Sequence, residues 1–158
     1  MKIKLLLLFF ALFSGLYSYS QKISRTTFRV SNISRNIQSI EMLIDENIVL
    51  TLTSNGESVS CNTITGGDID YWPALDKKGK VKSIGKINID YWGNITGKEG
   101  KIKSIGNTNV DYWPGFDKKG KVKSIGNINI DYWGNIPGKE GKIRSITGNT
   151  ATFYALSE

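Results

Sequence analysis

Four tryptophans are the side chains of this sequence best suited to binding a ligand. Each ends an Asp-Tyr-Trp step, at Trp72, Trp92, Trp113 and Trp133. A row of exposed indole rings can stack on sugar rings or hold a cation, so these residues are candidates for ligand binding. The alternative is that each ring covers its own loop by packing on an apolar loop residue, namely Leu75, Ile95, Phe116 or Ile136. We favour packing, because aromatic side chains at the ends of hairpins commonly serve it.

Opposite charges recur with the same regularity as the tryptophans. An aspartate precedes each Tyr-Trp pair, and a lysine or arginine follows it 12 or 13 positions later. If the two lie on neighbouring antiparallel strands, the charges face each other across the hairpin. The expected cross-strand pairs are Asp70 with Lys82, Asp90 with Lys103, Asp111 with Lys123, and Asp131 with Arg144. Each exposed pair would contribute about 0.2–1 kcal/mol, so we expect these pairs to fix strand register rather than to provide much stability.

The residue types that many enzymes and metal sites use are missing. The chain has no histidine and a single cysteine, Cys61, which excludes Ser-His-Asp and Cys-His catalysis, histidine-based metal sites and an internal disulfide. We expect Cys61 to be a small buried apolar residue of a strand. The Asn-x-Asp steps offer oxygen ligands for Ca²⁺, but the cationic side chains expected beside them oppose it. Acid–base catalysis needs two carboxyl groups in different environments, whereas a repeat supplies one environment several times. We therefore expect no enzyme activity, no metal site and no cofactor.

These candidate residues belong to a tandem repeat of about 20 residues. The repeated pattern is [IV]-D-Y-W, a loop, and then G-K-[VI]-[KR]-S-I, with the aspartates at 70, 90, 111 and 131. The loops alternate between two types, since residues 72–79 match 113–120 and residues 92–100 match 133–141. The duplicated unit is therefore a pair of repeats.

The pattern of each repeat allows two topologies. Strict alternation over Lys80–Trp92 places apolar or small residues on one face, which predicts one long strand per repeat with a glycine-associated bulge. The two loop types would then lie at opposite ends of the sheet. The alternative is a two-residue hairpin at Ile105–Thr108 and Ile125–Ile128, because Gly-Asn suits a type II′ turn. We favour the long strand, because short strands would place Lys80 and Lys82 on the apolar face.

Both topologies predict an all-β fold, an antiparallel up-and-down meander of tandem repeats. Only one face of each strand is apolar, so the repeats must form a single curved sheet or a barrel-like closure, or be covered by the N-terminal region. We expect one domain over residues 21–158, with a degenerate N-terminal cap at 21–67, four repeats at 68–149 and a closing strand at 150–158. The cap holds strand patterns at Asn47–Thr53 and Ser58–Ile64 with a turn between them, and Ile37–Ile44 fits either a helical turn or a strand.

The N-terminus has the pattern of a secretory signal peptide. Lys2 and Lys4 precede an apolar run over Leu5–Phe13, and small residues at Ser18 and Ser20 precede a cleavage site before Gln21. Loss of the two lysines lowers the net charge from +7 to +5. The sequence thus predicts a secreted protein, periplasmic, cell-surface or extracellular, with no transmembrane segment after cleavage of residues 1–20. The remaining lysines suit solvated turns and protected sheet edges, so we expect no nucleic-acid partner, and binding to another polyanion is a weaker alternative.

The segment Asp68–Ile146 resembles uncharacterised secreted bacterial β-repeat proteins. The unit from Asp111 to Gly126 carries their G-[KR]-[VI]-x-x-[IV]-G step, and its Asp-Tyr-Trp is more distantly similar to the YD repeats of Rhs-type toxin shells. The resemblance implies a β-repeat scaffold on the cell exterior and transfers no site residue. We expect a non-enzymatic structural or interaction module. The alternative is a carbohydrate-binding protein that uses the tryptophans. Expected partners are a cell-envelope glycan, a protein, or a second copy bound through the sheet edges.

Overall fold

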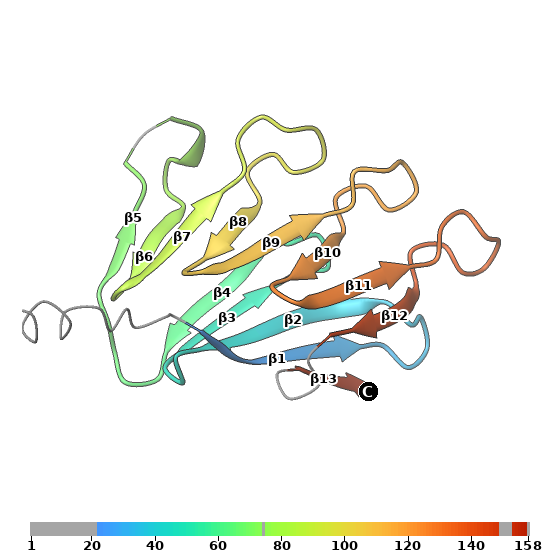
Figure 1. Ribbon diagram of the computed structural model, residues 1–158, viewed down its shortest axis with the longest axis horizontal. Coiled ribbons are helices and arrows are strands. Elements are labelled where there is room, and N and C mark those ends of the chain that lie inside the picture. Colours follow the sequence, from blue (N-terminus) through green and yellow to red (C-terminus); the bar gives the residue numbers. More distant parts are fainter. Residues whose placement is uncertain (1–21, 74, 149–152, 158) are drawn as a thin grey trace, which may run out of the picture.

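The computed structural model describes residues 22–73, 75–148 and 153–157 of the chain. It confirms the predicted all-β class, with two sheets instead of one curved sheet or barrel (Figure 1). The five-stranded sheet has the order β13-β1-β2-β3-β4, and the eight-stranded sheet has the order β12-β11-β10-β9-β8-β7-β6-β5. The predicted signal peptide and its cleavage site lie outside the described residues.

The strands of the first sheet are β1 (Ile23–Val30), β2 (Ile37–Ile44), β3 (Ile48–Leu52), β4 (Ser58–Thr63) and β13 (Phe153–Ser157). Those of the second sheet are β5 (Ile69–Tyr71), β6 (Val81–Ile84), β7 (Ile87–Tyr91), β8 (Ile102–Ile105), β9 (Thr108–Tyr112), β10 (Val122–Ile125), β11 (Ile128–Tyr132) and β12 (Ile143–Thr147). A short 3₁₀ turn, η1 (Leu75–Lys77), lies in the loop after β5.

The first sheet covers the apolar face of the second. Strand β2, whose sequence also fitted a helix, is extended and buries Ile40, Met42 and Ile44 at alternate positions. These side chains share one core with those of the repeat strands, such as Ile105 and Tyr112. The N-terminal region thus covers the apolar face of the repeat sheet, as one of the expected arrangements required. It is not a further copy of the repeat within the same sheet, since β4 and β5 belong to different sheets.

The C-terminal strand does not close the repeat sheet. Strand β13 pairs in parallel with β1, from Thr26 opposite Phe153 to Val30 opposite Ser157. The eight-stranded sheet therefore ends at β5 on one side and at β12 on the other. The predicted closing strand instead extends the first sheet.

The predicted long strand is wrong, and each such stretch is two short strands joined by a tight turn. Strands β6 and β7 pair through Ser83–Asn88 and Ile84–Ile87, with Gly85 and Lys86 forming the turn. Gly106 and Gly126 occupy the same first turn position in the later copies, and their φ angles of 53° and 57° are of the kind that a type II′ turn requires there. The glycines therefore make hairpin turns, which was the alternative topology.

A bulge explains why strict alternation predicts the wrong strand length. Tyr91 pairs with Ile102 and Asp90 pairs with Ser104, so Lys103 is an extra residue on β8. The extra residue lets Ile102 and Ile105 both face the core while Lys103 is exposed. Register shifts occur at the corresponding place in the other three repeats. The lysines therefore do not spoil the apolar face, and the bulge lies at the lysine instead of at the glycine.

The two-residue turns bring all four long loops to the same end of the sheet. The loops at 72–80, 92–101, 113–121 and 133–142 follow one another along that end, which corrects the expectation that the two loop types lie at opposite ends (Figure 1). Each loop is closed by its tryptophan, as where the Trp92 backbone N–H donates to Lys101 O at 2.8 Å and the Trp92 backbone oxygen accepts from the Gly100 N–H at 3.1 Å. From here on, a repeat means one such loop with its two flanking strands.

Candidate functional site

The four tryptophans lie in one row, because every long loop begins with one of them. Consecutive tryptophans start loops that are two strands apart, a separation of about 10 Å from twice the inter-strand spacing. All four rings are partly buried, and Trp72, Trp92 and Trp113 pack against the core. The row is longer than expected, since one long strand per repeat would have divided the tryptophans between two ends of the sheet.

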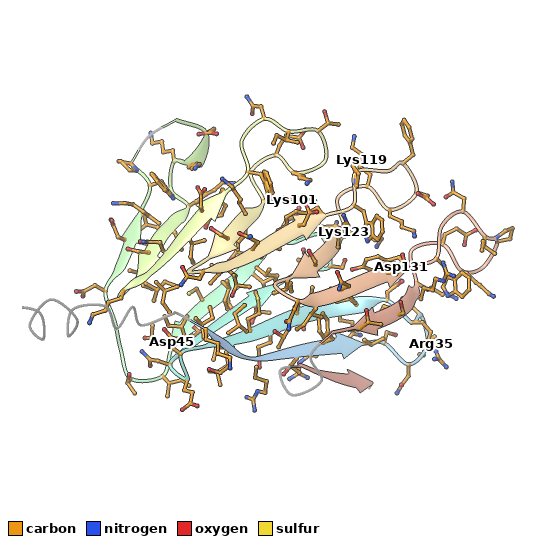
Figure 2. The ribbon with its side chains drawn as sticks, viewed as in Figure 1. Arg35, Asp45, Lys101, Lys119, Lys123 and Asp131 are labelled. Atoms are coloured by element: carbon orange, nitrogen blue, oxygen red, sulfur yellow. The ribbon has the colours of Figure 1, made fainter. Side chains whose placement is uncertain are left out.

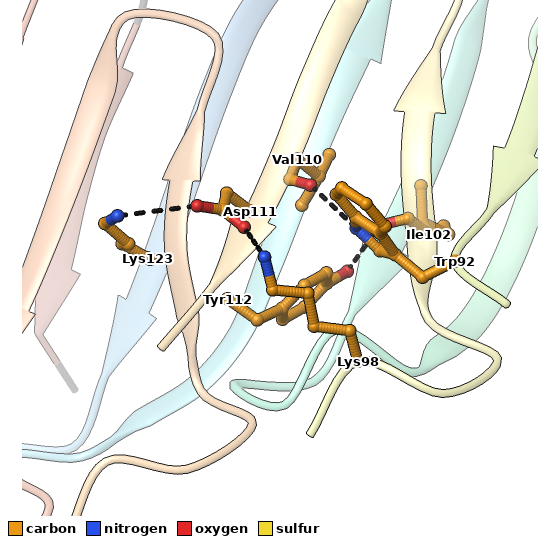
Figure 3. A network of polar contacts seen from close by, with 7 residues as sticks. All are labelled: Trp92, Lys98, Ile102, Val110, Asp111, Tyr112 and Lys123. Carbon is orange, nitrogen blue, oxygen red and sulfur yellow. Dashed lines mark hydrogen bonds and ion pairs between the residues drawn. The ribbon is translucent and has the colours of Figure 1, made fainter. Parts of the chain in front are cut away.

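Two of the indole N–H groups connect one repeat to the next. Trp92 Nε1 donates to the backbone oxygen of Val110 at 3.3 Å, and Val110 lies on β9 of the following repeat (Figure 3). Trp113 Nε1 donates in the same way to Ile130 O at 3.0 Å. The N–H of Trp72 is buried and has no acceptor within the described part of the chain. Trp92 and Trp113 therefore contact the neighbouring repeat as well as their own loop.

Each indole ring lies beside two cationic side chains. The Nζ atoms of Lys98 and Lys103 are 4.5 and 5.7 Å from the Trp92 ring centroid. The corresponding pairs are Lys77 and Lys82 at 4.9 and 5.9 Å from Trp72, Lys118 and Lys123 at 4.8 and 5.4 Å from Trp113, and Lys139 and Arg144 at 4.6 and 5.2 Å from Trp133. These distances are within the range of cation–π attraction, about 0.5–1 kcal/mol at exposed sites.

The structure contains the four cross-strand ion pairs that the repeat pattern predicts. The N···O distances are 2.8 Å for Lys82–Asp70, 3.4 Å for Lys103–Asp90, 3.5 Å for Lys123–Asp111 and 3.5 Å for Arg144–Asp131. Each cation comes from the bulged position of its strand, so the bulge brings it beside both the aspartate and the tryptophan.

A second set of ion pairs, which the cross-strand pattern did not predict, joins neighbouring repeats. Lys98 in the second loop donates to Asp111 Oδ1 of the third repeat at 2.5 Å, while Lys123 approaches Asp111 Oδ2 (Figure 3). Equivalent contacts join Lys77 to Asp90 at 2.6 Å and Lys118 to Asp131 at 2.7 Å. All three pairs are separated by 13 positions, and this constant interval is the signal that could have revealed them.

The surroundings keep these aspartates ionised. Partial burial alone would raise the pKa of Asp111, but hydrogen bonds from Lys98 and from the Tyr112 backbone N–H outweigh it and hold the pKa below its usual range. The pKa values of Asp90 and Asp131 are lowered by the same arrangement. The charged form of each aspartate is therefore the one that the fold uses.

A third set of contacts lies closer to the core. Lys101 Nζ donates to the backbone oxygen of Gly120 in the next loop at 2.5 Å and lies 5.1 Å from the Tyr112 ring centroid. The Tyr112 hydroxyl donates to Ile102 O at 2.9 Å within the core. Partial burial lowers the pKa of Lys101, and burial raises the pKa of Tyr112. Lys80 contacts Gly100 and the Tyr91 ring in the same way.

Phe116 does not cover its tryptophan as expected, and the side chain of Leu75 lies outside the described part of the structure. Phe116 is fully exposed, so it does not pack on Trp113, and Ile95 and Ile136 are 47% and 44% exposed. Cations, the core and the next repeat surround the indole rings instead. Cys61 does pack against the core, where burial raises its thiol pKa.

Within the described residues, no three His, Cys, Asp or Glu side chains lie close enough together to hold a metal ion. No helix of that part of the chain is long and apolar enough to cross a membrane. No protein-family model matches the chain, and comparison with curated proteins and with solved structures gives no significant match.

Proposed function

We propose that this protein is an exported, non-enzymatic β-repeat module that serves as a scaffold for interactions outside the cell. The observation that supports the proposal most strongly is the use of Trp92, Lys98 and Asp111. These residue types are suited to binding a ligand, yet here they bind the neighbouring repeat. Export rests on the signal-peptide pattern, and N-terminal sequencing of the exported chain, expected to begin at Gln21, tests it.

A single repeat is too small to fold alone, so the contacts between repeats stabilise the array. The array then presents a regular surface. In a repeat array, stability is approximately the sum of the stabilities of single repeats and of the contacts between neighbours. Each junction here combines an ion pair, a lysine–tyrosine cation–π contact and, at two junctions, an indole hydrogen bond. The outer loop residues, such as Phe116, Lys119 and Glu99, are exposed and available to a partner. Figure 2 shows Lys119 on the third long loop.

Carbohydrate binding is the second candidate, and one observation favours it. All four partly exposed tryptophans lie at the same end of the sheet, and a row of indole rings spaced at about 10 Å could follow an extended glycan. The cations beside each ring compete with this use, because a sugar that stacks on Trp92 must share its ring with Lys98 and Lys103. The scaffold is therefore the function that the geometry supports best.

A glycan-array screen of the exported chain, followed by tryptophan-fluorescence titration of any hit, separates the two candidates. We expect no saturable response, and we expect Trp92→Ala to lower the free energy of unfolding by about 1–3 kcal/mol, because it removes partly buried aromatic surface, a hydrogen bond and cation–π contacts. The matched control is Phe116→Ala, which removes an exposed aromatic and should change stability by less than about 0.5 kcal/mol. A sugar-specific response that Trp92→Ala abolishes in a still-folded chain would instead establish carbohydrate binding.

A further inference from the structure

The two ends of the eight-stranded sheet are incomplete in opposite ways. At β5, Ile69 and Tyr71 are 37% and 52% exposed. The residues at the same positions of the later repeats are at most 7% exposed: Ile89, Val110 and Ile130 for the first, and Tyr91, Tyr112 and Tyr132 for the second. In those repeats a lysine of the preceding repeat lies over the tyrosine ring, and β5 has no preceding repeat in its sheet.

The aspartate of the first repeat likewise lacks the contact that a preceding repeat supplies to the later aspartates. Asp90, Asp111 and Asp131 each hold one cation from their own repeat and one from the loop before. Asp70 has only its own-repeat partner, Lys82, among the described residues, and its carboxylate side chain is 56% exposed. The β5 edge therefore offers one carboxylate, one tyrosine ring and one strand edge without the contacts that the interior repeats supply.

The last repeat presents the complementary groups. Lys139 occupies the position of Lys77, Lys98 and Lys118, and its Nζ lies 4.6 Å from the Trp133 ring centroid. Unlike those lysines, Lys139 has no ion pair among the described residues, since no aspartate follows it in the next repeat position. Lys142 likewise occupies the position of Lys80, Lys101 and Lys121, which lie 5.0–5.2 Å from the tyrosine ring of the next repeat.

We infer that the last repeat of one copy binds the first repeat of a second copy, head to tail, through the same contacts that join repeats within the chain. Lys139 would pair with Asp70 of the second copy, Trp133 Nε1 would donate to Ile69 O, and Lys142 would lie over Tyr71. Strand β12 would pair with β5 of that copy as β8 pairs with β9, which places Ser145 opposite Asp68 in the way that Ser104 lies opposite Asn109. The inference rests on the proposed scaffold function and names its partner.

Charge, ring contacts and backbone pairing agree on one orientation. An exposed strand edge is a template for another strand, and here the groups beside each edge specify which strand it accepts. Because the two contacting surfaces differ, the contact is heterologous, and each copy keeps one unused end after it has bound another. The sheet twists in one direction from strand to strand, so successive copies form an open chain rather than a closed pair.

Sedimentation velocity of the exported chain over a range of concentrations tests this inference. The wild-type chain should form dimers and longer species as its concentration rises. Asp70→Lys and Lys139→Glu should each remain monomeric at concentrations where the wild type associates, because each places like charges across the contact. An equimolar mixture of the two variants should associate again, since every contact between unlike variants joins opposite charges and the two variants can alternate along the chain of copies.

Two interior substitutions serve as controls for net charge. Lys119→Glu and Glu99→Lys change the charge by the same amounts as the end variants, at exposed loop positions of interior repeats, and should associate as the wild type does. Lys139 lies in an exposed loop, so Lys139→Glu should fold. If Asp70→Lys does not fold, Lys139→Glu alone tests whether copies associate through this contact. A wild-type chain that stays monomeric, or end variants that behave like these controls, would overturn the inference. Either result would leave the effect of Trp92→Ala, and hence the proposed function, unaffected.

Discussion

Asp111 is a residue at which two repeats meet. One of its oxygens accepts from Lys98 of the preceding loop and the other faces Lys123 of its own hairpin. The partner from its own hairpin follows from strand pairing and could be predicted from the sequence. The loop partner depends on the path of a nine- or ten-residue loop over the next strand, which the alternation of side chains does not specify.

This arrangement predicts how stability depends on pH. A carboxylate whose pKa is lowered by folding adds stability above its unfolded pKa, and this stability is lost as the pH falls through the folded pKa. The free energy of unfolding should therefore be nearly constant near neutral pH and decrease below about pH 4, where unfolded aspartates bind protons first. Asp111→Asn should be less stable at pH 7 and should lose less stability between pH 7 and pH 3. Urea unfolding at the two pH values measures both, and an unchanged acid dependence would contradict the role of Asp111.

At the scale of the element, the strand content could be predicted well and the strand length could not. The strand pattern of β3 and the turn between β3 and β4 were visible in the sequence, as were the two-residue turns that were the alternative topology, whereas the sequence of β2 fitted either a helical turn or a strand. Strict alternation over Lys80–Trp92 pointed to a single strand because it allows no extra residue. The bulge at Lys82 adds that residue, so Val81 and Ile84 can face the same core from one short strand.

The loops predict a difference between two glycines of the third long loop. Gly120 has a φ of 79°, and an added Cβ would lie 2.6 Å from Lys101 Nζ, whereas a Cβ at Gly115 would have its nearest contact at 3.6 Å. Gly120→Ala should therefore lower the free energy of unfolding by about 1–2 kcal/mol through backbone strain and displacement of Lys101. Gly115→Ala should be neutral or slightly stabilising. Thermal and urea unfolding of the two variants provide the measurement, and equal effects would show that the contact of Lys101 with this loop is unimportant.

At the scale of the molecule, the first sheet covers the apolar face of the eight-stranded sheet, which consists of the four repeats. The N-terminal sheet contacts the repeats through backbone hydrogen bonds as well as the core, as where Val122 N–H donates to Ser54 O at 2.9 Å and Ile143 N–H donates to Arg35 O at 3.0 Å. The sequence indicated that such cover was one of two solutions, but hydrophobic patterning alone does not distinguish a covered sheet from a closed one. Likewise, the pattern identified the tryptophans as candidates but not the row that they form.

The central claim is that the tryptophan, lysine and aspartate side chains join neighbouring repeats. A double-mutant cycle between Lys98 of the second repeat and Asp111 of the third tests it most directly, with Lys98→Met, Asp111→Asn and the double variant compared by urea unfolding at pH 7. The contact predicts a coupling energy of about 0.5–1 kcal/mol, since both side chains are partly exposed. The control cycle replaces Lys98→Met with Lys119→Met, for which we expect no coupling. A coupling energy indistinguishable from that of the control would contradict the account and make these side chains available for a ligand.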